Sequence, residues 1–241
     1  MFQNITPAVK TIVIINVIIY IISLVIPNAV FLLSAYFPLS PNFKLFQLFT
    51  HIFLFNNFLV LLLFCIPFLS FGPLLERILG TKQFVLFFLT CAFVPYLIYS
   101  GISFIQYNSL TSSFSFEVVN SIYKSSYLFT NEVTELRNLQ IEERKTLQIL
   151  TTPFFGQEGA IFGFLMAFGL LCPNLTIMLL FPPIPLKAKY LIPISMGISI
   201  YFGYKDILQG NYAQLSYLYG AVVAFIWIYF FKRKHGIIEI Y

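Results

Sequence analysis

Charged residues are scarce in this chain. Only 10% of its 241 residues are charged, whereas 59% are hydrophobic, and the mean hydropathy is +0.87. A soluble domain of this size usually carries about a quarter charged residues to cover its surface. This shortage excludes an ordinary soluble protein and makes the lipid bilayer part of the solvent.

Cysteine and histidine are also rare. Cys65, Cys91 and Cys172 all lie in apolar runs, which excludes a disulfide framework in loops and a zinc site with closely spaced ligands. The two histidines, His51 and His235, are far apart, and the His-Glu-x-x-His pattern of zinc proteases is absent. We therefore expect no metal and no cofactor.

The net charge of +5 does not indicate a nucleic-acid-binding protein. The basic residues are scattered beside apolar runs, which is typical of the positive charges that orient membrane helices. The chain also lacks a Gly/Ser-rich or Pro-rich linker. We therefore expect a single membrane domain over residues 1–241.

Long apolar runs recur along the chain. A transmembrane helix needs roughly 20 apolar residues. Five segments come close to this length, and a sixth, about 190–204, is shorter and contains Pro193 and Gly197. The pattern predicts an all-α bundle of six transmembrane helices, the other five being about 11–27, 57–75, 83–101, 159–181 and 214–231.

The distribution of lysine and arginine predicts the orientation of this bundle. With the N-terminus inside, the short outer loops hold only Lys44 and Lys205. The inner side then holds Lys10, Arg77, Lys82, Lys187, Lys189, Lys232, Arg233 and Lys234. We therefore expect both termini in the cytoplasm.

Two segments expected on the outer side are unusually long. The first, about 28–56, is apolar but broken by prolines, so we expect it to lie at the interface or to fold back onto the bundle. The second, about 102–152, is polar and ends in a helix predicted near 131–150 with the mixed charges of a solvated face. We interpret it as a spacer on the membrane surface, with a docking surface as the alternative.

Three stretches carry a resemblance to a known family. They are Thr50-His51-Ile52-Phe53-Leu54-Phe55, which leads into a second span ending in Gly72-Pro73-Leu74-Leu75-Glu76-Arg77, then Gly156-Gln157-Glu158-Gly159, and finally Gln214-Leu215-Ser216-Tyr217-Leu218-Tyr219-Gly220. In order, spacing and position these stretches resemble rhomboid intramembrane proteases. The resemblance implies the six-helix bundle of that family.

The resemblance also implies where catalytic residues would stand. Active rhomboids have a nucleophilic serine at the start of the fourth span, a basic histidine in the sixth, and a histidine and an asparagine in the second that hold the oxyanion. The matching positions here are Glu158, Tyr217, Val60 and Phe64. Because all four depart from the catalytic type, we expect a pseudoprotease in which none of them is catalytic.

Glu158 is an ionisable residue inside a membrane segment, which by default suggests a function. A carboxylate at a helix N-terminus is also stabilised by unpaired backbone N–H groups. We expect Glu158 and Tyr217 to be direct or water-bridged neighbours that lock the fourth span to the sixth. Recognition of a ligand or a proton by Glu158 is the alternative. For His51 we expect a hydrogen bond that ties the folded-back outer segment to the bundle.

These observations predict a membrane scaffold or a client-binding subunit of a membrane protein complex, whose partners are membrane proteins or transmembrane segments. The alternative is a membrane enzyme with atypical chemistry centred on Glu158, such as an altered peptidase. A third hypothesis is a transporter, but a transporter would need several intramembrane ionisable groups, and this chain offers only Glu158. One version of the scaffold is a stable subunit of a larger envelope complex. The abundance of Phe, Ile, Asn and Lys suggests a bacterial chain, so we expect the inner membrane of a bacterium.

Overall fold

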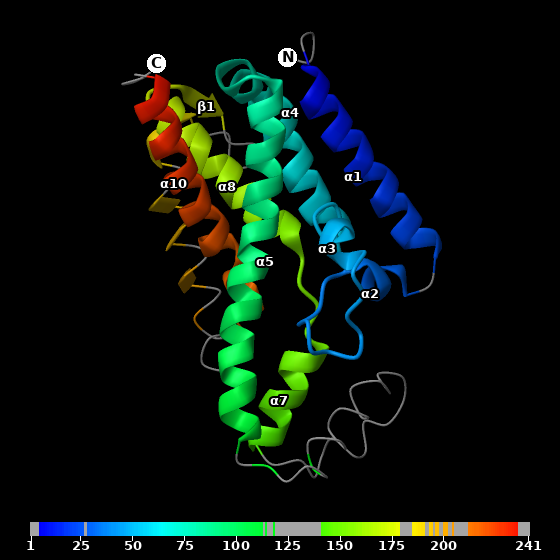
Figure 1. Ribbon diagram of the computed structural model, residues 1–241. Coiled ribbons are helices and arrows are strands. Elements are labelled where there is room, and N and C mark those ends of the chain that lie inside the picture. Colours follow the sequence, from blue (N-terminus) through cyan, green and yellow to red (C-terminus); the bar gives the residue numbers. More distant parts are fainter. Residues whose placement is uncertain are drawn as a thin grey trace.

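The computed structural model describes residues 5–26, 28–112, 114, 118, 141–178, 185–190, 193–194, 196–197, 200–201, 204 and 212–235. Its long helices run side by side, and both ends of the chain lie at the same end of the bundle (Figure 1). We call this the terminus end and the opposite one the far end. The long helices are α1 (Pro7–Val25), α4 (Phe58–Leu79), α5 (Thr81–Thr111), α8 (Gly156–Leu171) and α10 (Ser216–His235).

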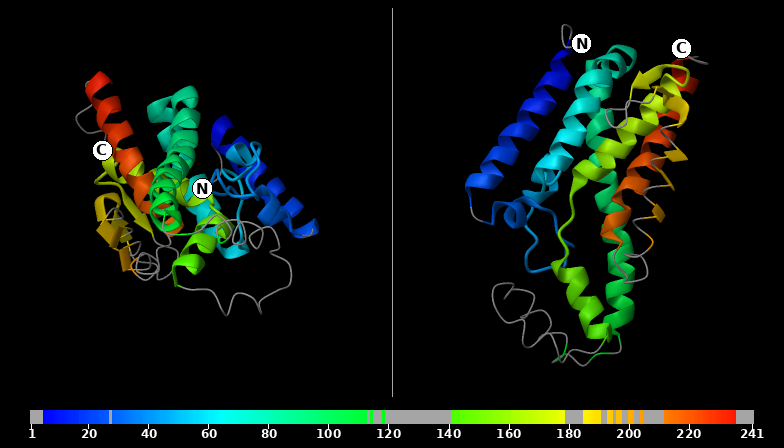
Figure 2. Two further views of the ribbon diagram at one scale, coloured as in Figure 1. Left: turned by 60° about the horizontal axis from the view of Figure 1, so that its bottom comes forward. Right: turned by 180° about the vertical axis from the view of Figure 1, so that it is seen from behind.

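The bundle consists of a tight group of three helices and a looser pair. α8 packs against both α5 and α10, which also contact each other, whereas α1 packs mainly against α4. The views from below and behind show α1 at one flank and α10 at the other (Figure 2). Helices α1 and α5 run away from the terminus end, and α4, α8 and α10 run towards it (Figure 1).

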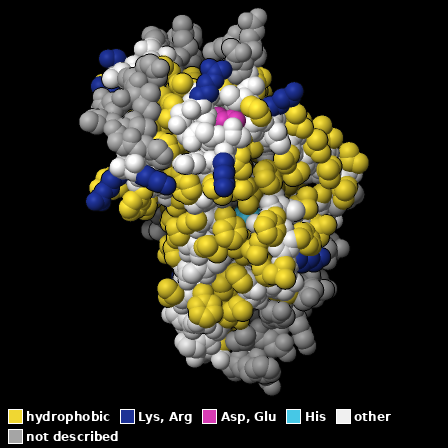
Figure 3. All heavy atoms as spheres, turned by 45° about the horizontal axis from the view of Figure 1, so that its top comes forward, with side chains coloured by type: hydrophobic (Ala, Val, Ile, Leu, Met, Phe, Trp, Pro, Cys, Tyr) yellow, Lys and Arg dark blue, Asp and Glu magenta, His cyan; other side chains and the backbone are white. Residues whose placement is uncertain are grey.

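Three helices in the described part of the chain are long and apolar enough to cross a membrane, namely α1, α4 and α5. Helix α8 is apolar but has only 16 residues. In a space-filling view, hydrophobic side chains cover the flank and most Lys and Arg side chains gather towards the terminus end (Figure 3). This banding is typical of a protein that lies in a bilayer.

Two helix boundaries differ from the prediction. The third span, expected to end at residue 101, continues to Thr111, because its polar last turns follow the apolar run without a proline or glycine after Gly101. The fourth span, expected to reach residue 181, ends at Leu171. Pro173 lies two residues beyond this end, and proline cannot donate a backbone hydrogen bond to continue a helix.

The expected all-α class is also corrected by a small antiparallel sheet. Strands β1 (Thr176–Met178) and β2 (Pro185–Lys187) pair in the register Thr176 with Lys187, and β2 leads into the short 3-10 helix η2 (Ala188–Tyr190). The sheet lies at the terminus end (Figure 1). β1 lies within the apolar run 159–181, and a short apolar stretch suits a strand as well as a helix, so hydropathy could not distinguish the two.

Two predicted helices fall partly outside the described residues. Only scattered positions of the fifth expected span, about 190–204, are described. The helix expected near 131–150 is present as α7 (Ile141–Thr151), while residues 131–140 lie outside the description. α7 packs beside the far end of α5 (Figure 1).

The segment between α1 and α4 folds back onto the bundle. It contains only two short helices, α2 (Ala29–Leu33) and α3 (Gln47–Thr50). The Tyr96 hydroxyl of α5 donates a hydrogen bond of 2.8 Å to the carbonyl oxygen of Tyr36, and the Ser40 hydroxyl donates to the carbonyl oxygen of Leu150 in α7. The first bond satisfies a backbone carbonyl of the segment, and the second satisfies a carbonyl near the end of α7.

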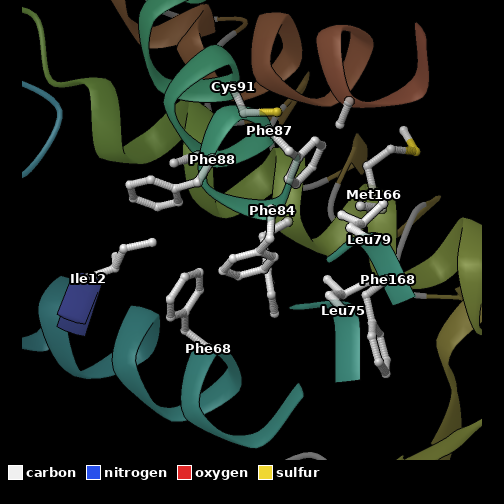
Figure 4. Packing of buried hydrophobic residues seen from close by; sticks show 14 of the residues in the cluster. Ile12, Phe68, Leu75, Leu79, Phe84, Phe87, Phe88, Cys91, Met166 and Phe168 are labelled. Atoms are coloured by element: carbon white, nitrogen blue, oxygen red, sulfur yellow. The ribbon is translucent and has the colours of Figure 1, made fainter. Parts of the chain in front are cut away.

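Aromatic side chains fill the centre of the bundle (Figure 4). The ring centroid of Phe68 on α4 lies 5.8 Å from that of Phe84, 5.7 Å from that of Phe88 and 5.1 Å from that of Phe164. Phe84 and Phe88 belong to α5, and Phe164 to α8. One aromatic residue thus joins three helices, and rings at these distances are within the range of favourable aromatic pairs.

A buried carboxylate fastens α1 to the pair α4 and α5. Glu76, only 2% exposed, accepts hydrogen bonds from the backbone N–H groups of Ala8 (3.3 Å) and Val9 (3.1 Å) and from the Thr81 hydroxyl (2.8 Å). Ala8 and Val9 belong to the first turn of α1, whose N–H groups have no partner within the helix. Glu76 therefore caps a helix that is distant from it in sequence.

Candidate functional site

The site predicted around Glu158 lies where the chain enters the bundle before α8. Sixteen residues of α8 measure about 24 Å, less than the hydrocarbon core of about 30 Å. α8 accordingly begins partway along α5 (Figure 1). The chain that reaches this point is extended and hydrogen-bonded: Phe154 and Ala35 exchange backbone bonds of 2.7 and 3.1 Å. Non-helical backbone at membrane depth is tolerated when it is paired in this way.

Glycines allow the helices around this point to approach closely. A Cβ on Gly159 would lie 2.6 Å from the carbonyl oxygen of Cys91, and a Cβ on Gly163 would lie 2.7 Å from the Cys91 sulfur. A Cβ on Gly220 of α10 would collide with the backbone of Gly159. Small residues at these positions bring α5, α8 and α10 into backbone contact.

Glu158 reaches across this contact to α10. Its Oε2 accepts a hydrogen bond of 2.5 Å from the hydroxyl of Ser216, a residue that is fully buried. The lock that we expected between the fourth and sixth spans is therefore made by Ser216, the residue before Tyr217. A short 3-10 helix, η3 (Ala213–Leu215), precedes Ser216 and sets its position at the start of α10.

The contacts described for the other predicted positions are with aromatic and apolar side chains. The Tyr217 ring packs against Phe162, with centroids 5.3 Å apart. Phe64 is 2% exposed and stacks on Phe68 at 4.6 Å, while Val60 is half-buried at the edge of the same core. The two positions that hold an oxyanion in active rhomboids are thus part of the apolar core of α4.

His51 lies beside the first residue of α8. Its carbonyl oxygen accepts a 3.0 Å hydrogen bond from the N–H of Gly156. This bond ties the folded-back segment to α8 as predicted, but it is made by the backbone of His51 and not by its side chain. Its Nδ1 lies 2.6 Å from the carbonyl oxygen of Gln47 and therefore carries the proton. Burial lowers the pKa of His51 to about 4, and the bond to Gln47 opposes this shift. The ring is thus neutral at pH 7.

Two further polar groups at this point have no hydrogen-bond partner in the described part of the chain. They are Nε2 of His51 and the side-chain amide of Gln157, residues that are 0% and 1% exposed. A Cβ on Gly156 would lie 3.1 Å from His51 Nε2, so glycine makes room for the imidazole. We name His51, Gln157, Glu158 and Ser216 the α8 N-terminal cluster.

Sequence reasoning did not identify Gln157 and Ser216. Serine and glutamine are common on helices, and the residue type alone does not predict which side chain on a neighbouring helix it will contact. The side chain of His235 lies outside the description. The described residues contain no group of three or more His, Cys, Asp or Glu side chains that could hold a metal ion.

Comparison with known proteins identifies the family. No curated protein and no solved structure matches the chain. One family model does match, over residues 10–239. The family is described as eukaryotic, and this does not support the bacterial inner membrane that we expected from composition. The match covers nearly the whole chain, and the chain therefore belongs to the family described as Eukaryotic integral membrane protein (DUF1751).

Proposed function

We propose that the chain is a non-proteolytic, rhomboid-like scaffold that binds transmembrane segments or partner membrane proteins without cleaving them. The observation that carries this proposal is the hydrogen bond between Glu158 and Ser216. Its acceptor, Glu158, stands at the position where the resemblance puts the serine nucleophile, and its donor, Ser216, directly precedes the position of the histidine base. A carboxylate at the nucleophile position cannot form the acyl intermediate of a serine protease.

The oxyanion positions support the same conclusion. Stabilising a tetrahedral intermediate requires hydrogen-bond donors directed at the developing negative charge. Val60 and Phe64 have no side-chain donor, and Phe64 lies against Phe55, Phe68 and Phe88. Loss of a catalytic serine and histidine lowers hydrolysis by orders of magnitude even where the fold persists.

The packing around Glu158 limits the access of water and substrate. Peptide hydrolysis needs a cavity that admits water to the nucleophile. The groove between α5 and α10 and the small cavity between α5 and α7 are both lined by residues outside the α8 N-terminal cluster. Close glycine contacts between α8 and α10 leave this region packed. A packed centre with a broad apolar flank suits binding of other membrane helices better than hydrolysis.

One observation favours an enzyme with atypical chemistry as the second candidate. Ser216 and Glu158 form a hydroxyl–carboxylate pair, in which the carboxylate could act as a base towards the serine oxygen. The full burial of Ser216 argues against this candidate. The two candidates make opposite statements about the reactivity of Ser216, so one experiment distinguishes them.

The experiment reconstitutes the purified chain in vesicles with a type I transmembrane segment that carries a photo-crosslinking residue. We expect light-dependent crosslinks to the chain and no cleavage of the segment. A fluorophosphonate probe, which labels activated serines, should leave Ser216 unlabelled. An active rhomboid in parallel vesicles serves as the control for both cleavage and labelling.

Two results would overturn the proposal. Cleavage that disappears in both Ser216→Ala and Glu158→Gln would establish the atypical peptidase. Absence of crosslinks to several unrelated transmembrane segments, with the chain folded, would remove the scaffold reading. Ser70→Ala is the matched control, since the Ser70 hydroxyl donates only to Ile66 within its own helix.

A further inference from the structure

A groove runs along the flank of the bundle between α5 and α10, away from the α8 N-terminal cluster. Its volume is about 470 Å³, which is within the range of about 300–1,000 Å³ for small-molecule sites. Val94 on α5 and Val223, Ile226, Trp227 and Phe230 on α10 form its apolar wall. The groove therefore takes a hydrocarbon rather than a polar molecule along most of its length.

The polar head of the groove lies at one end. Thr90, further along α5, also lines the groove, but its hydroxyl donates a 2.6 Å hydrogen bond to the carbonyl oxygen of Leu86 in the same helix. Gln83 in the first turn of α5 and Lys234 in the last turn of α10 both belong to its lining. Because α5 and α10 are antiparallel, these two residues share the terminus end (Figure 1). The groove thus combines an apolar body with a cationic head, which matches an amphiphile that has an anionic head.

The length of the groove matches one leaflet of a bilayer. From Lys234 to Val223 on α10, and from Gln83 to Val94 on α5, the helix rise gives about 16 Å. Half of the hydrocarbon core of a bilayer is about 15 Å. A lipid whose headgroup meets Lys234 would therefore lay one acyl chain along Trp227 and end it near Val94.

The positive charge of Lys234 is available for such a headgroup. Lys234 is exposed and has no acidic partner in the described part of the chain. Lys232 on the same turn is used differently, because its ammonium donates a 2.8 Å hydrogen bond to the carbonyl oxygen of Leu170 at the end of α8. The exposed Lys82 next to Gln83 adds a second positive charge at this end.

We propose that the groove between α5 and α10 binds one phospholipid with an anionic headgroup from the leaflet at the terminus end. The phosphate and its anionic substituent meet Lys234 and Gln83, and one acyl chain contacts Trp227. Basic pockets between transmembrane helices bind anionic headgroups in the same manner. This site does not depend on whether the chain is a scaffold or an enzyme.

The chain contains one tryptophan, Trp227, and this residue lies in the groove. Intrinsic tryptophan fluorescence therefore reports on the site alone. The purified chain is reconstituted in phosphatidylcholine bilayers that contain a minor fraction of either dibrominated phosphatidylserine or dibrominated phosphatidylcholine. Bromine atoms on an acyl chain quench tryptophan on contact. We expect phosphatidylserine to quench at roughly five-fold lower mole fraction, the effect of one lysine near an anionic lipid.

Charge variants identify the residue responsible. Lys234→Glu and the milder Lys234→Gln should lower the preference for phosphatidylserine towards that for phosphatidylcholine. Arg233→Glu is the matched control, because Arg233 is exposed, next in sequence and outside the groove lining. It should retain the preference. Native mass spectrometry should show one retained phosphatidylserine in the wild type and in Arg233→Glu, and none in Lys234→Glu.

Three outcomes would overturn the proposal. Equal quenching by both brominated lipids would mean that the groove does not select a headgroup. An equal loss of preference in Arg233→Glu and Lys234→Glu would mean that only the general surface charge acts. If neither lipid quenches the fluorescence of Trp227, another occupant, such as a partner helix, fills the groove.

Discussion

At the scale of single residues, burial gives side chains roles that their types do not predict. His51 is fully buried and neutral, with Nδ1 bonded to Gln47 and Nε2 beside Gly156. Glu158 keeps a hydrogen bond from Ser216 across two helices. Both residues hold the N-terminal end of α8 in place, and both make testable contributions to stability.

His51 predicts a loss of stability in acid. Its pKa is about 4 in the folded chain and 6.5 in the unfolded chain, so the unfolded state binds the proton first. Stability should therefore be complete above pH 6.5, fall as the pH drops through this value, and level off below pH 4. The slope is at most about 1.4 kcal/mol per pH unit. Thermal melting in detergent between pH 4 and 8 measures it.

The variant His51→Asn should flatten this pH dependence, since its amide can still donate to Gln47 but does not titrate. An unchanged slope in His51→Asn would show that another group is responsible.

Ser216→Ala should destabilise the folded chain at pH 7. It removes the donor to a carboxylate that cannot find another partner easily, and such losses amount to about 1.5–3 kcal/mol. The midpoint of thermal aggregation measures the change. Ser70→Ala, an equal substitution within a helix, should shift the midpoint much less. Equal shifts in both variants would contradict a special role of the hydrogen bond to Glu158.

At the scale of elements, backbone contact determines how α8 meets its neighbours. The glycines of α8 face Cys91 on α5 and Gly220 on α10, and at Gly159 the backbone of α8 meets the backbone of both neighbours. α1 relies instead on a cap from Glu76, because its flank is largely exposed. The bundle therefore has one rigid group of helices and one helix that is attached mainly at its first turn.

Gly220→Ala should destabilise the bundle, because the added methyl group would collide with the backbone of Gly159, which cannot rotate away. Overpacking of this kind amounts to about 1–3 kcal/mol. Gly101→Ala is the matched control: it also lies in a helix, but a Cβ there meets nothing within 4 Å. It should leave stability unchanged or raise it. A tolerated Gly220→Ala would refute the close contact of α8 and α10.

Glu76→Ala should loosen α1 before the rest of the bundle. The change removes three hydrogen bonds to a buried carboxylate, worth roughly 2–4 kcal/mol together. Amide hydrogen exchange of residues 8–12 should accelerate, while exchange in α8 stays slow. Glu142→Ala on the exposed face of α7 should change neither. Uniform acceleration in all helices would contradict a local cap.

At the scale of the whole molecule, both termini lie at the same end of the bundle (Figure 1). Most of the lysine and arginine side chains visible in Figure 3 also gather towards this end. Since cytoplasmic loops carry an excess of these residues, we predict that this end faces the cytoplasm.

Epitope tags at the two ends of the chain test this orientation. In eukaryotic cells whose plasma membrane alone is permeabilised, antibodies should reach both tags. A tag inserted near residue 125 should stay protected until all membranes are opened. Protection of either terminal tag would reverse or break the predicted topology.

The sequence by itself determined that this is an integral membrane protein and where the long helices α1, α4 and α5 lie. Hydropathy adds along the chain, so a long apolar run is recognisable without its neighbours, and α1, α4 and α5 agree with the predicted spans except at their ends. The sequence also shows which residue types stand at the four positions that match the catalytic residues of rhomboids, namely Glu158, Tyr217, Val60 and Phe64. Both properties are local.

Only the tertiary structure decided which side chains meet. Glu158 accepts a hydrogen bond from Ser216, the residue before the expected Tyr217, and one step along a helix turns the side chain by about 100°. The cap of α1 by Glu76 and the groove between α5 and α10 likewise join residues far apart in sequence. Such contacts depend on how each helix is rotated against the next, and hydropathy along a single chain carries no information on this rotation.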